Sequence, residues 1–362
     1  MSSPTVSSPQ PSQVSLLASE QRSAELESAI AARPSAYRVL TGDRPTGALH
    51  IGHYFGTLQN RVRLADAGVG LLVVIADYQV ITDRTMTAGL TADVLGQVAD
   101  YLAVGIDPGR ATIFAHSQVA ALNQLLLPFL SLVSVAEVQR NPTVKDEMAA
   151  AGPAAVSALM FSYPVHQAAD ILFCHANVVP VGKDQLPHVE LTRTVARRFN
   201  DRYSPDRPYF PEPQALLSAA PLLLGLDGRK MSKSLHNTVP LRATADETKA
   251  LIAAARTDPE RVISYDPEHR PEVSNLLLIA ALCRGVLPQE LAGEIGAGGS
   301  AALKAMVTQA INDRFAAIRA RRQELAADPG YLRAVLAEGN QRADEIATGT
   351  LNTVRELMHT SY

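Results

Sequence analysis

The sequence predicts an α/β fold in which a doubly wound parallel sheet is followed by an all-helical C-terminal domain. Short apolar runs alternate with helix-like stretches between residues 37 and 200, and this alternation is typical of a parallel sheet covered by helices. The run at 70–77, GLLVVIAD, is almost wholly apolar, as expected of a strand buried on both faces. From residue 244 onward the chain has only helical periodicity.

The elements follow one another at the spacing of a Rossmann-type sheet. We expect strands at 37–42, 70–77, 111–116 and 177–182, and helices at 48–66, 91–104 and 184–200. Helical stretches fill the chain up to about 176, with a break at Gly152-Pro153. The Ser/Pro/Gln-rich residues 1–14 are expected to be disordered, 15–33 to form a short surface helix, and the proline-rich 203–214 to be a loop.

Changes in character along the chain predict its domains. We expect an N-terminal extension at 1–33, the sheet domain at 34–222 with a helical insertion at about 118–165, and a lysine-bearing loop at 223–240. The helical domain follows at 241–362, and its first helix is predicted to begin with a capping box of Thr244 and Glu247. Ligands of a doubly wound sheet bind at the carboxyl ends of its strands.

Composition narrows the class of protein. The 362 residues are 47% hydrophobic and 19% charged, and contain no apolar run long enough to span a bilayer. The first residues lack the basic and apolar regions of a secretory signal. Cys174 and Cys283 lie in apolar, helix-like segments, which favours a reducing, cytoplasmic location without disulfides or a membrane. With a net charge of −3, the chain must meet any nucleic acid through a local basic patch.

The stretch TGALHIGHYFG, residues 46–56, joins the first strand to the first helix. His50 and His53 lie three residues apart on the first helical turn, where unpaired backbone N–H groups favour phosphate. Gly52 between them leaves room for a flat ring against the backbone. A pair of core histidines or a surface turn are the alternatives. The pair is a poor zinc site, because no further His or Cys is placed to complete it, and we expect no metal.

The stretch GLDGRKMSKSLHN, residues 225–237, carries Lys230 and Lys233 in a loop bounded by glycine. Two lysines on a mobile loop can contact phosphates as point charges, although a solvated basic loop is the simpler alternative. Together His-Ile-Gly-His and Lys-Met-Ser-Lys-Ser resemble the signature pair of class I aminoacyl-tRNA synthetases. This resemblance implies amino-acid activation by ATP on a Rossmann-type domain, followed by transfer to tRNA.

Asp170 lies in the apolar middle of a predicted helix, VHQAADILF. A buried carboxylate needs a donor. An internal cap, or a salt bridge to Arg193 or another cation, would supply one. A substrate N–H, such as that of an indole, is the functional alternative, because a site built around one acceptor rejects analogues that lack the donor.

The surrounding segment is similar to that of tryptophanyl-tRNA synthetases, and the likeness runs from about Tyr37 to about Met358. It includes Ala-Ala-Asp-Ile-Leu at 168–172, Val-Pro-Val-Gly at 179–182 and Glu-Leu-Thr-Arg at 190–193. The resemblance implies that Asp170 accepts the indole N–H and that Tyr163 and Gln185 bind the amino group.

Further residues are assigned by the same resemblance. The expected tryptophan site comprises Leu40, Gln79, Tyr163, Gln167, Asp170, Val179, Val181 and Gln185. The expected ATP site comprises Arg44, Thr46, Gly52, His53, Gly182, Lys183, Asp184, Leu222, Lys230, Met231, Ser232, Lys233 and Ser234. His50, His53, Lys230, Ser232 and Lys233 are the expected catalytic residues, and Mg²⁺ is expected to be carried by ATP.

Several residues depart from the family pattern. Arg44 stands where the family commonly has glutamine, Gln79 where many bacterial members have histidine, and His166-Gln167 where many have Leu-Met. This combination resembles a divergent, auxiliary-type bacterial branch. It suggests altered tolerance to tryptophan analogues or indole-type inhibitors.

The resemblance also implies partners. It implies L-tryptophan, tRNA(Trp) and a second copy of the chain, with the helices of 120–165 as the expected dimer surface. Lys145 is a candidate for pyrophosphate contact or a generic surface lysine. Arg314, Arg319, Arg321 and Arg322 are candidates for tRNA phosphate contacts, or belong to a solvated helix face with Asp313 and Glu324. Other readings are a tyrosyl-type enzyme, a non-translational paralogue and a smaller adenylyltransferase.

Overall fold

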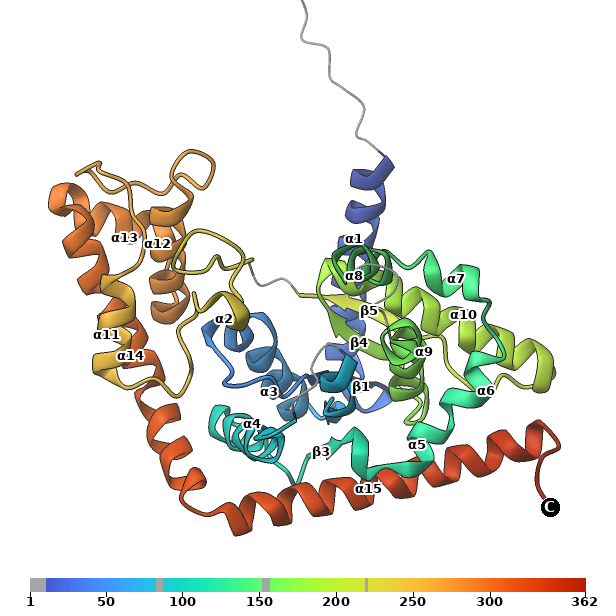
Figure 1. Ribbon diagram of the computed structural model, residues 1–362. Helices are drawn as coiled ribbons and strands as arrows, with labels where there is room; N and C mark the ends of the chain where they lie inside the picture. Colours follow the sequence, from blue (N-terminus) through green and yellow to red (C-terminus); the bar gives the residue numbers. More distant parts are fainter. Residues whose placement is uncertain (1–10, 83–86, 152–156, 219–220) are drawn as a thin grey trace, which may run out of the picture.

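A five-stranded parallel sheet forms the centre of the protein. The computed structural model describes residues 11–82, 87–151, 157–218 and 221–362. The strands are β1 (Arg38–Asp43), β2 (Gly70–Ile75), β3 (Ala111–Ala115), β4 (Val178–Val181) and β5 (Gln214–Leu217), in the order β3-β2-β1-β4-β5 (Figure 1). The α/β prediction with a doubly wound parallel sheet and a C-terminal helical region is therefore confirmed.

Strand β5 was not predicted from the sequence, and it begins at the last residue of the predicted proline-rich loop, 203–214. Val178 of β4 pairs with Gln214 and Val181 pairs with Leu217, so the strand is short and parallel. Its first backbone N–H donates to the Asn177 carbonyl at 2.9 Å. Main-chain pairing at the edge of an existing sheet stabilises this segment, and side-chain periodicity over four residues is too weak to reveal it.

The helix after β1 begins later than predicted and is not uniform. Helix α2 covers Ile51–His53, a π-helical turn covers Tyr54–Leu58, and α3 covers Gln59–Asp66. Predicted residues 48–50 therefore precede the helix, and His50 is its N-cap. Helix α1 spans Pro11–Ala32 and begins before the predicted boundary at residue 15.

The remaining helices of the sheet domain follow the expected order. Helix α4 spans Leu90–Val104 and α10 spans Leu186–Tyr203. Between β3 and β4 lie α5 (Ala120–Gln124), α6 (Leu126–Leu130), α7 (Val135–Gln139), α8 (Pro142–Ala151) and α9 (Ala158–Leu172). The predicted break at Gly152-Pro153 lies outside the described residues.

The C-terminal part is helical, as predicted. Its helices are α11 (Ala245–Ala253), α12 (Pro271–Arg284), α13 (Pro288–Ile295), α14 (Gly299–Ala326) and α15 (Pro329–Leu357). The capping box is confirmed, because Glu247 N–H donates to Thr244 Oγ1 at 3.1 Å and Thr244 N–H donates to Glu247 Oε2 at 2.7 Å.

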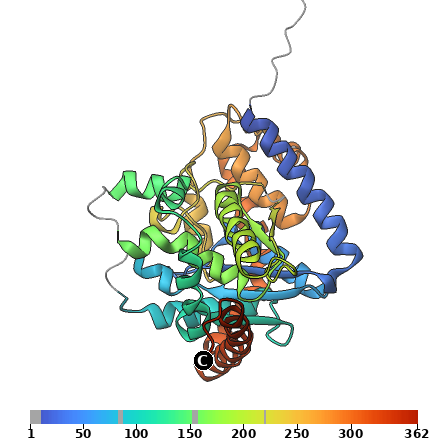
Figure 2. The same cartoon turned by 90° about the vertical axis from the view of Figure 1, so that its right-hand side faces the viewer.

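Helix α15 returns from the helical region and runs along the sheet edge at β3 (Figures 1 and 2). Gly339 lies so close to β3 that a Cβ there would meet the Ile113 carbonyl. Asn340 Oδ1 accepts the Ala115 backbone N–H at 2.9 Å. The final helix thus covers the sheet, and the domain limits given above remain predictions.

Two apolar cores lie on opposite faces of the sheet. Leu71 and Val73 of β2 belong to one core, with much of the helical region, whereas Leu72 and Val74 belong to the other, with α9 and α10. Burial of both faces explains the continuous apolar run at 70–77. Within the described ranges, no single helix has both the length and the hydropathy of a membrane span, although α12 with Pro288–Ala326 passes as a pair bent by 109°.

Candidate functional site

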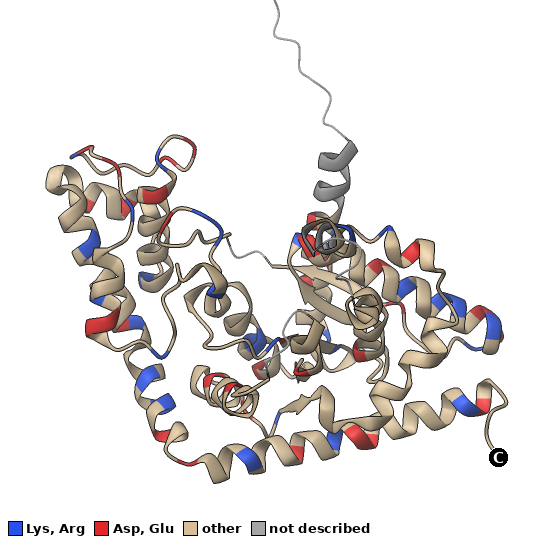
Figure 3. Cartoon of the chain, in the orientation of Figure 1, with Lys and Arg blue, Asp and Glu red and all other residues tan. Residues whose placement is uncertain are grey.

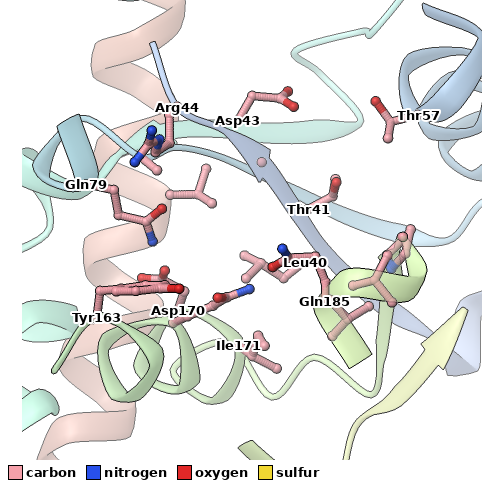
Figure 4. A pocket seen from close by; sticks show the side chains of 18 of the residues that line it. Leu40, Thr41, Asp43, Arg44, Thr57, Gln79, Tyr163, Asp170, Ile171 and Gln185 are labelled. Atoms are coloured by element: carbon pink, nitrogen blue, oxygen red, sulfur yellow. The ribbon is translucent and has the colours of Figure 1, made fainter. Parts of the chain in front are cut away.

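A pocket of about 410 Å³ opens at the carboxyl ends of β1 and β4. The chain leaves β1 toward β2 and β3 on one side and places β4 and β5 on the other, so this is the switch point at which open α/β sheets bind ligands. All eight residues of the expected tryptophan site line it, together with Arg44 and Gly182 of the expected ATP site (Figure 4). Their individual roles remain predictions.

Asp170 of α9 lines this pocket and is only 2% exposed. Its partner is His116, whose Nε2 lies 2.8 Å from Asp170 Oδ1. The expected alternative partner, Arg193, instead pairs with Glu190 and Glu212 on the surface. The buried carboxylate therefore has an ion-pair partner, and it is a residue that the sequence did not single out.

His116 follows β3 directly and is fully buried. Burial alone would lower the pKa of its imidazole, but the negative charge of Asp170, with a further contribution from Asp77, raises the pKa above its usual value. Its position at the carboxyl end of a strand was the available sequence signal, because that edge carries the ligand site.

His116, His166 and Asp170 also form the buried cluster closest to a metal site among the described residues. One ligand atom from each lies within 4.8 Å of the others. The 2.8 Å separation of His116 Nε2 and Asp170 Oδ1 is shorter than the roughly 3.3 Å that two ligands on one tetrahedral zinc require. The geometry is that of an ion pair.

A second buried network supports the end of β1. Arg61 Nη1 lies 2.5 Å from Asp43 Oδ2, and the Tyr101 hydroxyl donates to the same oxygen at 2.7 Å. Burial alone would raise the pKa of Asp43, but Arg61 holds it far below its usual range. Asp43 and Arg61 both line the pocket and were missed, since neither belongs to a recognisable motif.

His50 and His53 lie together at the start of the helix, with ring centroids 3.8 Å apart. The His50 backbone N–H donates to His53 Nδ1 at 3.2 Å. Burial, each other's proximity and the charge of Lys233 lower the pKa of His50 to about 3, and burial and Lys233 lower that of His53 to about 4. Both rings are therefore neutral at pH 7, suited to hydrogen bonding and not to ion pairing.

The lysine loop, residues 223–240, is docked against this turn. Ile51 N–H donates to the Val239 carbonyl at 3.0 Å, and Leu241 N–H donates to the Leu49 carbonyl at 2.9 Å. Lys233 Nζ donates to the Gly47 carbonyl at 3.0 Å. The structure thus brings together two motifs that are some 180 residues apart in the sequence.

Asn237 holds the loop in shape. It is 4% exposed, and its Nδ2 donates to Asp227 Oδ1 at 2.7 Å and to the Lys230 carbonyl at 3.0 Å. Its Oδ1 accepts the Ser232 N–H at 2.9 Å. Sequence reasoning did not single out this residue.

The other expected ATP-site residues do not line this pocket, and Leu222 lines a separate, smaller one. Met231 covers Gly52, where a Cβ would lie 2.8 Å from the Met231 sulfur. Lys183 pairs with Glu20 of α1 at 3.0 Å. Among the remaining expected ATP-site residues, Thr46 and Ser232 are half-buried, whereas Asp184, Leu222, Lys230 and Ser234 are exposed.

Three of the four candidate tRNA-contacting arginines are bonded within the protein. Arg314 donates to the Tyr54 hydroxyl at 2.7 Å, Arg319 to Thr248 Oγ1 at 2.8 Å, and Arg322 to the buried carboxylate of Asp100. Arg321 is exposed. Figure 3 shows this run of basic residues on the second half of α14.

The switch-point pocket, the paired histidines and the docked lysine loop define a class I aminoacyl-tRNA synthetase. Residues 33–316 match the family model for class I tRNA synthetases (W and Y), and the chain belongs to this family. Two similar relatives are the tryptophan--tRNA ligases of Clostridium longisporum and Streptococcus pyogenes, at 38% and 40% identity over 90% of this chain and 97% and 98% of theirs.

A solved structure agrees with this assignment. The tryptophanyl-tRNA synthetase of Campylobacter jejuni complexed with ADP and tryptophane is 30% identical to this chain, with a TM-score of 0.77. The match covers 89% of this chain and 99% of that one. The alternative of a smaller adenylyltransferase is thereby corrected.

Proposed function

We propose that this protein is a tryptophan--tRNA ligase, which activates L-tryptophan with ATP and transfers it to tRNA(Trp). The observation that carries the proposal is the pocket at the switch point. Leu40, Val179 and Val181 give it apolar walls, and the carboxylate of Asp170 provides a buried acceptor. An apolar ring with one N–H donor fits this combination, and an analogue without the donor cannot form a hydrogen bond to the carboxylate.

The first step joins two substrates without a protein nucleophile. The tryptophan carboxylate attacks the α-phosphorus of ATP, an α-phosphorus–oxygen bond breaks, and pyrophosphate leaves with its electron pair. The protein orients the reactants and stabilises the charge that develops on the phosphates. Tyr163 and Gln185 line the pocket beside Asp170, where they would bind the amino group.

The turn that carries His50 and His53 and the lysine loop would bind the phosphates. Neutral His50 and His53 would donate hydrogen bonds to phosphate oxygens at the helix start. Lys233 already lies at this turn through its bond to Gly47, and exposed Lys230 would join it when the loop closes on the leaving pyrophosphate. Mg²⁺ would enter on the β- and γ-phosphates and be held mostly by nucleotide and water.

The second step requires tRNA and, by the same family assignment, a homodimer in the cytoplasm. Leu127 of α6 and Val135 of α7 are 70% and 69% exposed, so the helical insertion offers apolar surface for a second copy. Arg321 is the exposed candidate for a tRNA phosphate contact.

Gln79 supports the narrower proposal of altered analogue tolerance, because it lines the pocket where many bacterial members have histidine. Replacing it with histidine should change the inhibition constants of indole-type inhibitors. Identical constants in both proteins would remove the proposal.

ATP–pyrophosphate exchange with each amino acid in turn tests the activity. We expect exchange with tryptophan and little with tyrosine. Exchange with tyrosine alone would favour a tyrosyl-type enzyme, and exchange with neither would favour a non-translational paralogue.

A further inference from the structure

The carboxylate of Asp170, in the expected tryptophan site, has an ion-pair partner from another element. Asp170 lies on α9, whereas His116 belongs to the turn that follows β3. Their 2.8 Å contact is off the line of an ideal hydrogen bond, and it is therefore best described as an ion pair. It is the one ion pair of Asp170 within the described parts of the chain.

Hydrogen bonds to the backbone of His116 and from the next residue hold this turn in place. Asn123 Nδ2 of α5 donates to the His116 carbonyl at 2.7 Å. The next residue, Ser117, donates its N–H to Asp77 Oδ1 at 3.0 Å and its hydroxyl to Asp77 Oδ2 at 2.5 Å. The turn is thus fixed to the end of β2 on one side and to α5 on the other.

His166, in the same cluster, hydrogen-bonds a different residue. Its Nε2 donates to Asn123 Oδ1 at 2.8 Å, and its ring lies 4.7 Å from that of His116. Burial lowers the pKa of His166, so its ring is neutral. Asp170 and His166 from α9 and Asp77 from the segment after β2 are the titratable groups that act on His116 in the described structure.

We propose that His116 is a positioning residue for indole recognition: it pairs with Oδ1 of Asp170 and fixes the orientation of that carboxylate, so that Oδ2 is left to accept the substrate N–H. This inference rests on the proposed function. A carboxylate that is held through one oxygen keeps its other oxygen at a fixed position, as a substrate-binding group requires. A carboxylate free to rotate would hold the substrate N–H less well, and the site would discriminate less against rings that lack N–H.

The test compares tryptophan with its benzothiophene analogue, in which sulfur replaces the indole N–H. The readout is the ratio of their kcat/KM values in ATP–pyrophosphate exchange. We expect His116→Leu to lower this ratio on the order of tenfold or more, with little change in the KM for ATP. His116→Gln, which retains a donor, should preserve more of the ratio. A ratio unchanged in a folded His116→Leu variant overturns the proposal.

A second measurement does not depend on the leucine variant. In the wild-type chain the ratio should fall as pH rises through the raised pKa of His116 and the ion pair with Asp170 is lost, whereas His116→Gln should give a flat profile. A flat wild-type profile overturns the proposal. His175→Asn is the matched control, because that half-buried histidine packs on Tyr209 and Phe210 away from the pocket. Wild-type protein that shows no exchange with tryptophan would instead contradict the proposed function.

Discussion

The pKa values of the buried histidines at this site are shifted in opposite directions, and the neighbouring charges decide the direction. His53 lies near Lys233 and Arg61, so burial and these charges together depress its pKa to about 4, although Asp43 opposes them. His116 lies against Asp170 and has a raised pKa. The same side chain therefore has a lowered pKa beside the lysine loop and a raised pKa beside the buried carboxylate.

The depressed pKa of His53 makes a prediction for stability. Between pH 6.5 and about 4 the unfolded chain binds a proton at this residue and the folded chain does not. Stability therefore falls as pH falls through this window, by up to about 1.4 kcal/mol per pH unit. His53→Asn retains an acceptor for the His50 N–H but cannot titrate, so its melting temperature should fall less between pH 6.5 and 4.5.

The control for this measurement is His359→Asn, because His359 is exposed near the C-terminus. It should reproduce the wild-type slope. A slope in His53→Asn equal to that of the wild type would show that His53 is not a neutral buried group.

Predictions for single residues are confirmed where the local sequence alone shows what the residue requires. The apolar run around Asp170 indicates a buried carboxylate that requires a partner, and the structure contains one in His116. Of the alternatives that the sequence left open, a salt bridge to Arg193 is wrong, because Arg193 pairs with surface carboxylates. The sheet topology brings in His116 from more than 50 positions away, which proximity along the chain does not reveal. For the same reason, the sequence did not reveal Arg61 and Asn237.

At the scale of elements, the lysine loop is kept in shape by one buried amide. The side chain of Asn237 bonds Asp227, Lys230 and Ser232, and a Cβ on Gly225 would collide with it. This loop carries Lys230 and Lys233, so its shape sets where both charges lie. The motif itself was evident in the sequence, but the residue that shapes it was not.

Asn237→Ala should lower the adenylation rate more than its effect on folding explains. The substitution leaves backbone groups of the loop without partners, which costs on the order of 1–3 kcal/mol, and it also lets the lysines move. Single-turnover adenylate formation at saturating substrates, with the melting temperature measured in parallel, separates the two effects.

Asn200 provides the matched control. It is also buried and bonds a loop through the Tyr209 and Phe210 backbone, but it lies on α10 away from the lysine loop. Asn200→Ala should reduce stability to a similar degree and leave the rate per folded molecule unchanged. Equal rate losses in both variants would contradict the role given to Asn237.

At the scale of the whole molecule, helix α14 is tied to the signature turn. Arg314 bonds the Tyr54 hydroxyl, and Tyr54 packs edge-on against Phe315 with centroids 4.9 Å apart. Arg322 pairs with Asp100, whose other oxygen accepts the Leu49 N–H at 3.3 Å. These contacts explain why arginines that the sequence offers as tRNA ligands lie inward. A periodic pattern locates a helix but does not say which of its basic residues remain exposed.

Arg321 and Arg322 should therefore respond differently to substitution. Arg321→Ala should weaken tRNA binding, lower the salt dependence of binding by about one unit of slope, and leave pyrophosphate exchange intact. Arg322→Ala leaves the Asp100 carboxylate buried without its cation and should destabilise the fold by about 3–5 kcal/mol. Filter binding across a salt series and thermal unfolding measure these effects. A loss of stability in Arg321→Ala, or weaker tRNA binding by a stably folded Arg322→Ala, would contradict these assignments.

The central claim is that one switch-point pocket selects an indole through Asp170. Because the chain contains no tryptophan, the fluorescence of added tryptophan reports its own binding, and titration with protein measures the affinity directly. We expect a saturable change with the wild type, a large loss of affinity in Asp170→Ala, and no competition by tyrosine at comparable concentration. Undiminished tryptophan affinity in Asp170→Ala, or effective displacement by tyrosine, would contradict the account.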